Sequence, residues 1–514
     1  MVKTVNKDKI LFWLNANLTQ YMMSYYLHKK YPCDMYAVID ITNKPKKFFE
    51  TQQFAPYKKT WFFHDNLKIS NNVDISFLEK FEKEYEIDLW KLIINERIFY
   101  RFFNFHRFSR SEILSILEQS IKLYLKIFDE VKPDFFIAEA PVLHHSELIY
   151  QIMLKKNVKC LLLSIPKLSG KSLISEKIHQ VDYVKSLAEI PSKNRTLDEL
   201  QNYIQTNRTD TSVNQYWKTM NKSKIVTLKA LLDFILSDND DIKSHYTYFG
   251  RTKLRVLFST MITTLQKKYR QNFMKRNLRN EFDFSSPYVY FPMFVDMDRN
   301  SLIGAPFSTN QIEIIRTVAK SLPIEYKLYV KEHPGQVGRE WRPTSQYKEI
   351  SEIPNVYLFH PSLSGEEFIK NSSLVISIAG ASPFEATFHN KPSIVFGDVI
   401  YSLIPSVFKV QQIEQLPELI RKSLCSNVDV SDLDKFVELL ERNTNDFNQF
   451  SFEMKYLHEF YYGGTLINSK LDPTKIEKFL NENKIVLEKL AEAHIEKIKQ
   501  HKKFKQKVQD VSQI

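Results

Sequence analysis

Two polar side chains able to bind phosphate lie at the end of an apolar stretch in the second half of the chain. The sequence KLYVKEHP occupies residues 327–334, and Pro334 biases His333 toward an extended backbone. Because side chains alternate between the faces of a strand, Lys331 and His333 share one side and Glu332 takes the other. A lysine charge and a histidine hydrogen bond converging at a strand end predict a nucleotide-phosphate site. A capped strand end with a solvated lysine is the alternative.

A glycine-containing turn supplies the second candidate site. The apolar run Leu374–Ile378 is typical of a strand buried on both faces, and the sequence PSIVFG predicts the next strand after a short helix. We expect Ser382 at the helix N-cap, where it can also contact phosphate, Pro383 at the first helical position, and Glu385 at the third, as in a capping box. Gly380 allows the tight turn and close approach of a ligand. Such a βαβ unit directs backbone N–H groups at the strand ends, which favours phosphate.

The order of strand and helix patterns places both sites in the later of two α/β domains. Strands alternate with helices at the start of the chain and again from Tyr288, whereas strand patterns vanish in the middle and near the end. We therefore expect an N-terminal α/β domain at 1–185, a helical basic connecting segment at 186–284, a C-terminal α/β domain at 285–428 and a helical extension at 429–514.

Length and composition exclude several classes of protein. The 514 residues are 43% hydrophobic, as in a globular protein of more than one domain. The three cysteines show neither CxxC nor zinc-ligand spacing, so we expect a reducing cytoplasm, no disulfide framework and no metal. The N-terminal apolar run is too short for a signal peptide, and no run has the length of a membrane span. The net charge of +12 predicts an acidic partner.

A basic, amphipathic stretch lies in the connecting segment at residues 251–280. It contains nine Lys or Arg and no acidic residue, and its apolar residues recur at helical intervals, as at Leu254, Leu257, Phe258, Met261, Ile262 and Leu265. One interpretation is a helix that packs its apolar stripe on protein. The other is a surface that meets anionic lipid headgroups or an acidic glycan, which would make the protein peripheral at the inner face of the cell membrane.

Four motifs resemble those of the capsule polysaccharide biosynthesis family: YVYFPMFVDMD, LYVKEHPG, IAGASPFEA and KPSIVFGDVIY, in this order and spacing. That family includes the 3-deoxy-manno-octulosonic acid (Kdo) transferases of bacterial capsule assembly. The likeness is clearest over 285–402 and weaker over 120–185. It implies a GT-B fold of two Rossmann-type domains and transfer from a nucleotide-activated sugar, with CMP-activated acidic sugars as the known donors. The family's Gly-Thr-Ala-Gly-Trp-Glu-like turn corresponds here to GASPFE at 380–385, which lacks the threonine and the second glycine.

The resemblance implies roles for the residues singled out above. In GT-B enzymes an acid near Glu385 holds the donor ribose, which competes here with the capping-box interpretation. No cofactor or bound metal is expected, because helix dipoles and basic side chains stabilise the departing nucleotide. The donor-binding set is Lys331, His333, Gly380, Ser382 and Glu385.

The acceptor side of such an enzyme needs a general base that removes a proton from the acceptor hydroxyl. Glu139 ends the predicted strand FFIAEA, and His144 and His145 follow shortly after it. Glu139 and His144 are therefore the catalytic candidates, and a solvated loop is the alternative. The predicted partners are a nucleotide-sugar donor and a glycan or glycolipid acceptor.

Two other functions fit parts of the sequence. Nucleotide-sugar 2-epimerases share the double-Rossmann layout and a similar Gly-to-Glu turn, but they act on the donor without an acceptor. A non-catalytic assembly or nucleic-acid-binding protein is suggested only by the basic charge. Because the aromatic residues lack the pattern of a single-strand stacking platform, we expect no nucleic-acid partner.

Overall fold

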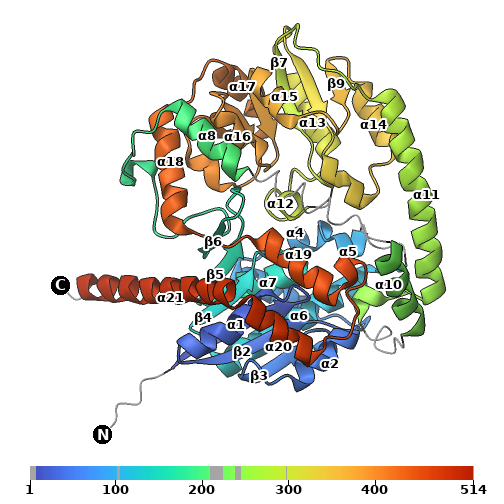
Figure 1. Cartoon of the computed structure of the whole chain (residues 1–514), viewed down its shortest axis with the longest axis vertical. Coiled ribbons are helices and arrows are strands. Elements are labelled where there is room, and N and C mark those ends of the chain that lie inside the picture. Colours follow the sequence, from blue (N-terminus) through green and yellow to red (C-terminus); the bar gives the residue numbers. More distant parts are fainter. Residues whose placement is uncertain (1–6, 101–104, 209–223, 238–244, 297, 513–514) are drawn as a thin grey trace.

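The computed structural model describes residues 7–100, 105–208, 224–237, 245–296 and 298–512, which form two α/β domains along the long axis of the molecule (Figure 1). Each domain is built on a sheet of buried, largely apolar strands, as the continuous apolar runs predict. The predicted α/β fold class with two Rossmann-type domains is confirmed.

The first sheet has the order β13-β6-β5-β4-β1-β2-β3. The five strands from β5 to β3 pair in parallel, while β6 and β13 are antiparallel to their neighbours. The strands are β1 (Asp8–Asn15), β2 (Cys33–Asp40), β3 (Tyr57–Phe62), β4 (Phe135–Glu139), β5 (Lys159–Ser164), β6 (Ser172–Ser175) and β13 (Thr444–Asn445). The helices between them are α1 (Thr19–Lys30), α2 (Asn43–Thr51), α3 (Ile75–Tyr85), α4 (Leu89–Ile94), α5 (Arg97–Tyr100), α6 (Arg110–Val131) and α7 (His144–Lys155).

The second sheet is parallel throughout and has the order β12-β11-β10-β7-β8-β9. Its strand order reverses between β7 and β10, which places a ligand crevice outside the carboxyl ends of these strands. The strands are β7 (Tyr288–Pro292), β8 (Lys327–Lys331), β9 (Val356–Phe359), β10 (Leu374–Ser377), β11 (Ser393–Val395) and β12 (Val407–Lys409). The helices are α12 (Arg299–Leu302), α13 (Gln311–Ser321), α14 (Thr344–Ser351), α15 (Gly365–Asn371), α16 (Ser382–Thr387) and α17 (Leu416–Leu424).

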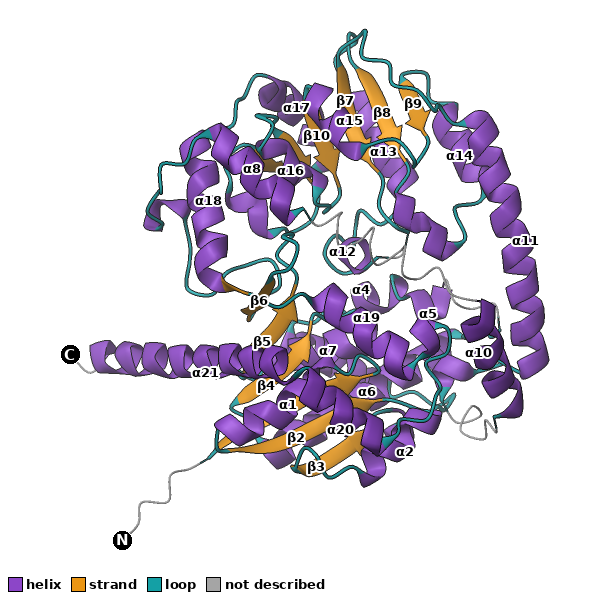
Figure 2. Cartoon of the chain, viewed as in Figure 1, coloured by secondary structure: helices purple, strands orange, loops and turns teal. Residues whose placement is uncertain are grey.

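The helices expected as a separate C-terminal extension are shared between the two domains (Figure 2). Helix α18 (Val430–Asn443) packs on the second domain, where the Phe436 ring lies 5.5 Å from that of Phe384. The chain then returns to the first domain, adds β13 to its sheet, and packs its last helices beside α1. These helices are α19 (Gln449–Phe460), α20 (Pro473–Glu482) and α21 (Lys484–Ser512). Residues 429–514 therefore do not form a unit of their own.

The connecting segment is also divided between the domains. Helix α8 (Leu197–Asn207) buries Leu200 and Ile204 in the core of the second domain. Helix α10 (Lys224–Leu236) is tied to the first domain by a 2.7 Å ion pair between Asp233 and Lys44. The long helix α11 (Lys253–Asn277) runs along the flank of the molecule from the first domain to the second (Figure 1). None of the described helices has both the length and the apolar character needed to cross a membrane.

Candidate functional site

The predicted phosphate-binding pair lies at the carboxyl end of β8. Lys331, the last residue of the strand, is 6% exposed, and His333 is half-buried at the start of a short 3-10 turn. The backbone N–H of Gly335 donates to His333 Nδ1 at 3.0 Å, so the proton of the neutral imidazole is on Nε2. Burial, together with the charge of Lys331, lowers the pKa of His333 to about 4. At neutral pH this side chain is therefore an uncharged hydrogen-bond donor beside a buried lysine.

Glu332 takes the opposite direction, as the strand alternation predicts. Its side chain is fully buried, and Oε2 accepts from Arg342 Nε at 2.8 Å and from the Tyr347 hydroxyl at 2.9 Å. Its other oxygen accepts from the His333 backbone N–H at 2.7 Å. This internal ion pair fixes the backbone at the point where the chain leaves β8, and so positions the His333 imidazole.

The turn after β10 differs from the predicted capping box. Helix α16 begins at Ser382, with Ala381 at its N-cap in a helical conformation and no side-chain cap. The helix therefore starts one residue earlier than expected, and Glu385 does not reach back to the N-cap. Instead, Glu385 Oε2 accepts from Arg208 Nη2 at 3.1 Å. Sequence reasoning missed Arg208, because only the fold brings the segment after α8 to this turn.

Gly380 lies where an added side chain would be packed tightly against its surroundings. A Cβ atom there would lie 3.1 Å from both the Phe294 ring and Ser377 Oγ. The glycine thus permits close packing of the turn against the segment that follows β7. The hydroxyl of Tyr401 donates to the Gly380 carbonyl and holds the turn from its other side.

Asp298 lies where the two domains meet. Its negative charge partly opposes the lowering of the pKa values of Arg97 and Lys167 in the first domain and of His333 in the second. Beside it, Arg299 begins α12 and donates from Nε to the Pro141 carbonyl of the first domain at 2.6 Å. Burial lowers the pKa of Arg97, Lys167 and Arg299. Helix α12 lies between the domains in Figure 1.

Glu139 ends β4, as predicted, but its carboxyl group is buried near α19. Its pKa is raised well above the ordinary value by burial and by the charge of Glu453, and a hydrogen bond with Thr19 opposes the shift only in part. Its Oε1 atom has no hydrogen-bond partner in the described part of the chain. Burial also raises the pKa of Glu453 to about 7. Burial therefore favours the protonated form of Glu139 in this conformation, whereas a general base must be ionised before it accepts a proton.

Replacing Glu453 by glutamine should make stability less dependent on pH. Because the folded-state pKa is raised from 4.5 to about 7, the folded protein keeps a proton that the unfolded chain releases. Stability therefore falls as pH rises through this window, and Glu453→Gln should reduce the fall in melting temperature between these pH values. The control is Glu459→Gln, a substitution of an exposed residue on the same helix. If the melting temperatures of the two variants depended on pH in the same way, the raised pKa of Glu453 would be contradicted.

His144 has the hydrogen-bond arrangement of a base. It begins α7, is buried, and its Nδ1 lies 2.9 Å from Glu96 Oε2, which also accepts from the His144 backbone N–H at 2.6 Å. Burial lowers the pKa of His144. Burial raises the pKa of Glu96, but hydrogen bonding with His144 outweighs it and brings this pKa to about 2. Glu96 is thus ionised and accepts Nδ1–H, while Nε2, without a partner among the described residues, keeps its lone pair.

A cavity of about 230 Å³ joins this dyad to the second domain. Glu96, Arg97 and His144 line it from the first domain, and Leu302 and Ile303 line it from the second. Sequence reasoning missed Glu96, which lies 48 residues before His144 and outside any recognisable motif. Glu139 and His144, although close in sequence, have different partners and form no common site.

Further histidines pack next to the Glu96–His144 dyad. Asp40, at the end of β2, has its two oxygens each 2.9 Å from a histidine, His64 Nε2 and His145 Nε2. Burial would raise the pKa of Asp40, but the charge of His145 and hydrogen bonds from both histidines lower it. A strand that ends in an acid was the only sequence signal for Asp40. No group of three His, Cys, Asp or Glu side chains in the described ranges is arranged to hold a metal ion.

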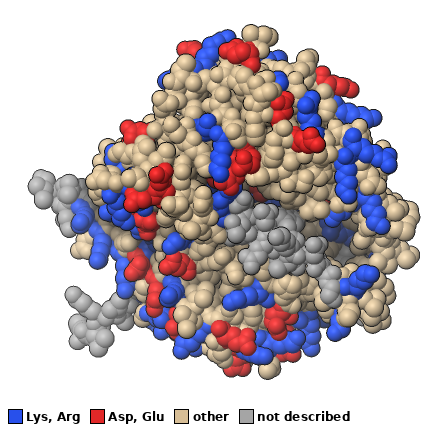
Figure 3. All heavy atoms as spheres, turned by 45° about the horizontal axis from the view of Figure 1, so that its top comes forward, with Lys and Arg blue, Asp and Glu red and all other residues tan. Residues whose placement is uncertain are grey.

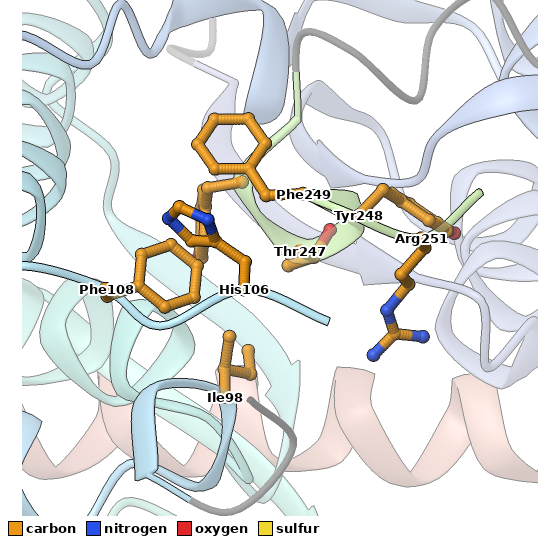
Figure 4. Close-up of a pocket in the computed structure, with 8 residues that line it drawn as sticks. Ile98, His106, Phe108, Thr247, Tyr248, Phe249 and Arg251 are labelled. Atoms are coloured by element: carbon orange, nitrogen blue, oxygen red, sulfur yellow. The ribbon is translucent and has the colours of Figure 1, made fainter. Parts of the chain in front are cut away.

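A second cavity of about 170 Å³ lies beside the start of α11 and is mainly aromatic (Figure 4). The His106 ring lies 4.7 Å from Phe108 and 5.3 Å from Phe249, and Arg251 is at the other end of the group. Tyr246 connects this cavity to the histidines, since its hydroxyl lies 3.2 Å from His145 Nδ1.

The fold and site together define two Rossmann-type domains that enclose an interdomain region rich in cations. Residues 184–405 match the family described as "capsule polysaccharide biosynthesis protein", so the family predicted from the sequence is confirmed for this part of the chain. No curated protein sequence matches the chain.

Solved structures with similar folds include two of KpsC from Thermosulfurimonas dismutans. The β-Kdo 2,7-transferase is 13% identical, with 70% of this chain and 97% of that one covered and a TM-score of 0.27. The β-Kdo 2,4-transferase is also 13% identical, with 64% and 88% covered and a TM-score of 0.30. UDP-GlcNAc 2-epimerase from Methanocaldococcus jannaschii is 12% identical, with 84% and 99% covered and a TM-score of 0.26.

Proposed function

We propose that the protein is a glycosyltransferase of surface polysaccharide biosynthesis. The observation that carries this proposal is the pairing of two sites across one interdomain region. The second domain presents Lys331 and the neutral donor His333, and the first presents the Glu96–His144 dyad. The charge of Asp298 acts on His333 of the second domain and on Arg97, which adjoins Glu96 in the first, and we infer that donor and acceptor groups meet there.

In this mechanism the second domain binds the nucleotide of the donor sugar. Lys331 contributes charge and His333 Nε2–H a hydrogen bond to phosphate, while Gly380 and Ser382 border the same crevice. Glu385, which accepts from Arg208, takes the role of hydrogen-bond acceptor from a ribose hydroxyl. The cations around Asp298 suit a donor with an additional carboxylate, such as a CMP-activated acidic sugar. His144 Nε2 removes the proton of the acceptor hydroxyl as that oxygen attacks the anomeric carbon and the nucleotide departs.

The acceptor is a glycan or glycolipid, and residues 251–280 hold the protein at an anionic membrane surface where such an acceptor lies.

The deciding experiment supplies CMP-, UDP- and GDP-linked sugars with and without an oligosaccharide acceptor and analyses the products, in the presence and absence of a metal chelator. Acceptor-dependent release of nucleotide with a new glycosidic bond, unaffected by the chelator, is expected. Conversion of the donor to its 2-epimer without acceptor would replace this proposal with an epimerase.

His333→Ala should weaken nucleotide binding without unfolding the protein. The lost hydrogen bond to a charged phosphate amounts to about 1.5–3 kcal/mol, which is on the order of tenfold or more in affinity. Calorimetric titration with CMP measures the effect, and His458→Ala, an exposed histidine on α19, is the control. Equal affinity of the two variants for CMP would show that the phosphate does not bind at the end of β8.

A further inference from the structure

Helices α10 and α11 expose more large apolar side chains than any other part of the described chain. On α11 these include Leu254 and Phe258, which are 80% and 61% exposed. Their spacing along both helices recurs at three and four residues, so each set forms one row on the outward face. The rows consist of Ile225, Leu228, Leu232 and Leu236 on α10 and of Leu254, Phe258, Met261, Leu265 and Tyr269 on α11.

The charge of this surface has one sign. Helix α11 contains seven Lys or Arg and no acidic residue. The single acid of α10, Asp233, is neutralised by Lys44. Exposed cations accompany the apolar row of α11, namely Arg255, Lys268, Lys275 and Arg276. Lys and Arg side chains gather along the right-hand flank in Figure 3, the flank on which α11 runs in Figure 1.

The two helices are fixed to the rest of the molecule. Arg270 Nη1 donates to the backbone carbonyls of Glu340 at 3.2 Å and Trp341 at 2.8 Å in the second domain. Lys253 Nζ donates to the Ile235 carbonyl at 2.7 Å and ties α11 to α10. The apolar rows therefore belong to a preformed surface held by both domains.

We propose that the outward faces of α10 and α11 together form a docking surface for an anionic lipid bilayer. This extends the membrane contact proposed above from residues 251–280 to a second helix and assigns the apolar rows to the acyl boundary and the cations to the headgroups. The charge decides against a second copy of this chain as the occupant, because a symmetric contact through α11 would bring like charges together without any acid on that helix. An anionic lipid leaflet, in contrast, neutralises the cations of α11.

Co-sedimentation of the full chain with phosphatidylcholine vesicles, with or without phosphatidylglycerol, tests the proposal. Binding should require the anionic lipid and weaken with salt. A charge variant carries glutamine at Arg255, Lys268, Lys275 and Arg276, and its binding should fall on the order of a thousandfold. An apolar variant carries Phe258→Gln, Met261→Gln and Leu265→Gln, and it should lose binding while keeping its melting temperature. The matched control removes the same charge from α21 at Lys489, Lys499, Lys503 and Lys505 and should bind like wild type.

Several results would overturn the proposal: no binding by wild type, unchanged binding by the charge variant, or equal loss in the α21 control. A concentration-dependent dimer that only the apolar variant loses, without vesicle binding, would assign the surface to a second copy. Nucleotide release with a water-soluble oligosaccharide acceptor is measured in parallel. Both surface variants should keep wild-type turnover in that assay, so failure of lipid binding and failure of the glycosyltransferase proposal are distinguishable.

Discussion

Replacing His144 by asparagine is expected to lower turnover by about 10²–10⁴-fold, the usual contribution of a general base. The asparagine amide can still donate to Glu96 near the position of Nδ1, but the basic Nε2 atom is lost. Because burial lowers the pKa of His144, the wild-type rate should rise with pH below the ordinary histidine value of 6.5 and then level off. The variant should lose this rise while its nucleotide affinity stays the same. Near-normal turnover would remove His144 from the mechanism and return attention to Glu139.

Glu96→Gln tests the positioning role of the carboxylate. Glutamine can still accept from Nδ1–H but carries no charge, so the imidazolium loses its stabilising partner and the His144 pKa falls further. The rising limb of the pH–rate profile should therefore move to lower pH, with a smaller loss of turnover than in His144→Asn. A purely structural role would change the melting temperature and leave the profile in place.

Glu332→Ala is expected to cause the largest loss of stability. The substitution breaks the buried 2.8 Å pair and leaves the Arg342 guanidinium with the more distant Asp296 at 3.8 Å, which costs up to about 3–5 kcal/mol. Urea denaturation followed by circular dichroism measures the change. The control is Glu313→Ala, which breaks an exposed pair with Arg316 at 2.8 Å and should cost at most about 1 kcal/mol. Similar losses in the two variants would show that Glu332 and Arg342 do not act as a buried pair.

The parallel strands were the most predictable part of the fold. The buried strand β10 is a nearly continuous apolar run, and the alternation of side chains at the end of β8 was enough to separate Glu332 from Lys331 and His333. The start of α16 was less predictable, because Ser382 and Ala381 compete for the N-cap.

The chemical setting of the candidate site was not predictable, since it depends on contacts between distant segments. Glu139 appeared open at a strand end, but α19 returns to the first domain more than 300 residues later and buries it beside Glu453. Glu96 and Arg208 have no motif of their own, and only tertiary structure brings them to His144 and Glu385. Conversely, the stripe on α11 was visible in the sequence, whereas its continuation on α10 depended on knowing which face is exposed.

Helix α11 also limits how the two domains can move relative to each other. Its 25 residues span about 37 Å, and a continuous helix resists both compression and stretching. Because it joins the domains along one flank, it keeps the distance between its two points of attachment constant. The domains therefore cannot approach along that flank, and closure around a substrate must be a rotation that narrows the side opposite α11. If α11 lies on a bilayer, the rotation axis lies near the membrane plane and the interdomain region closes from the far side.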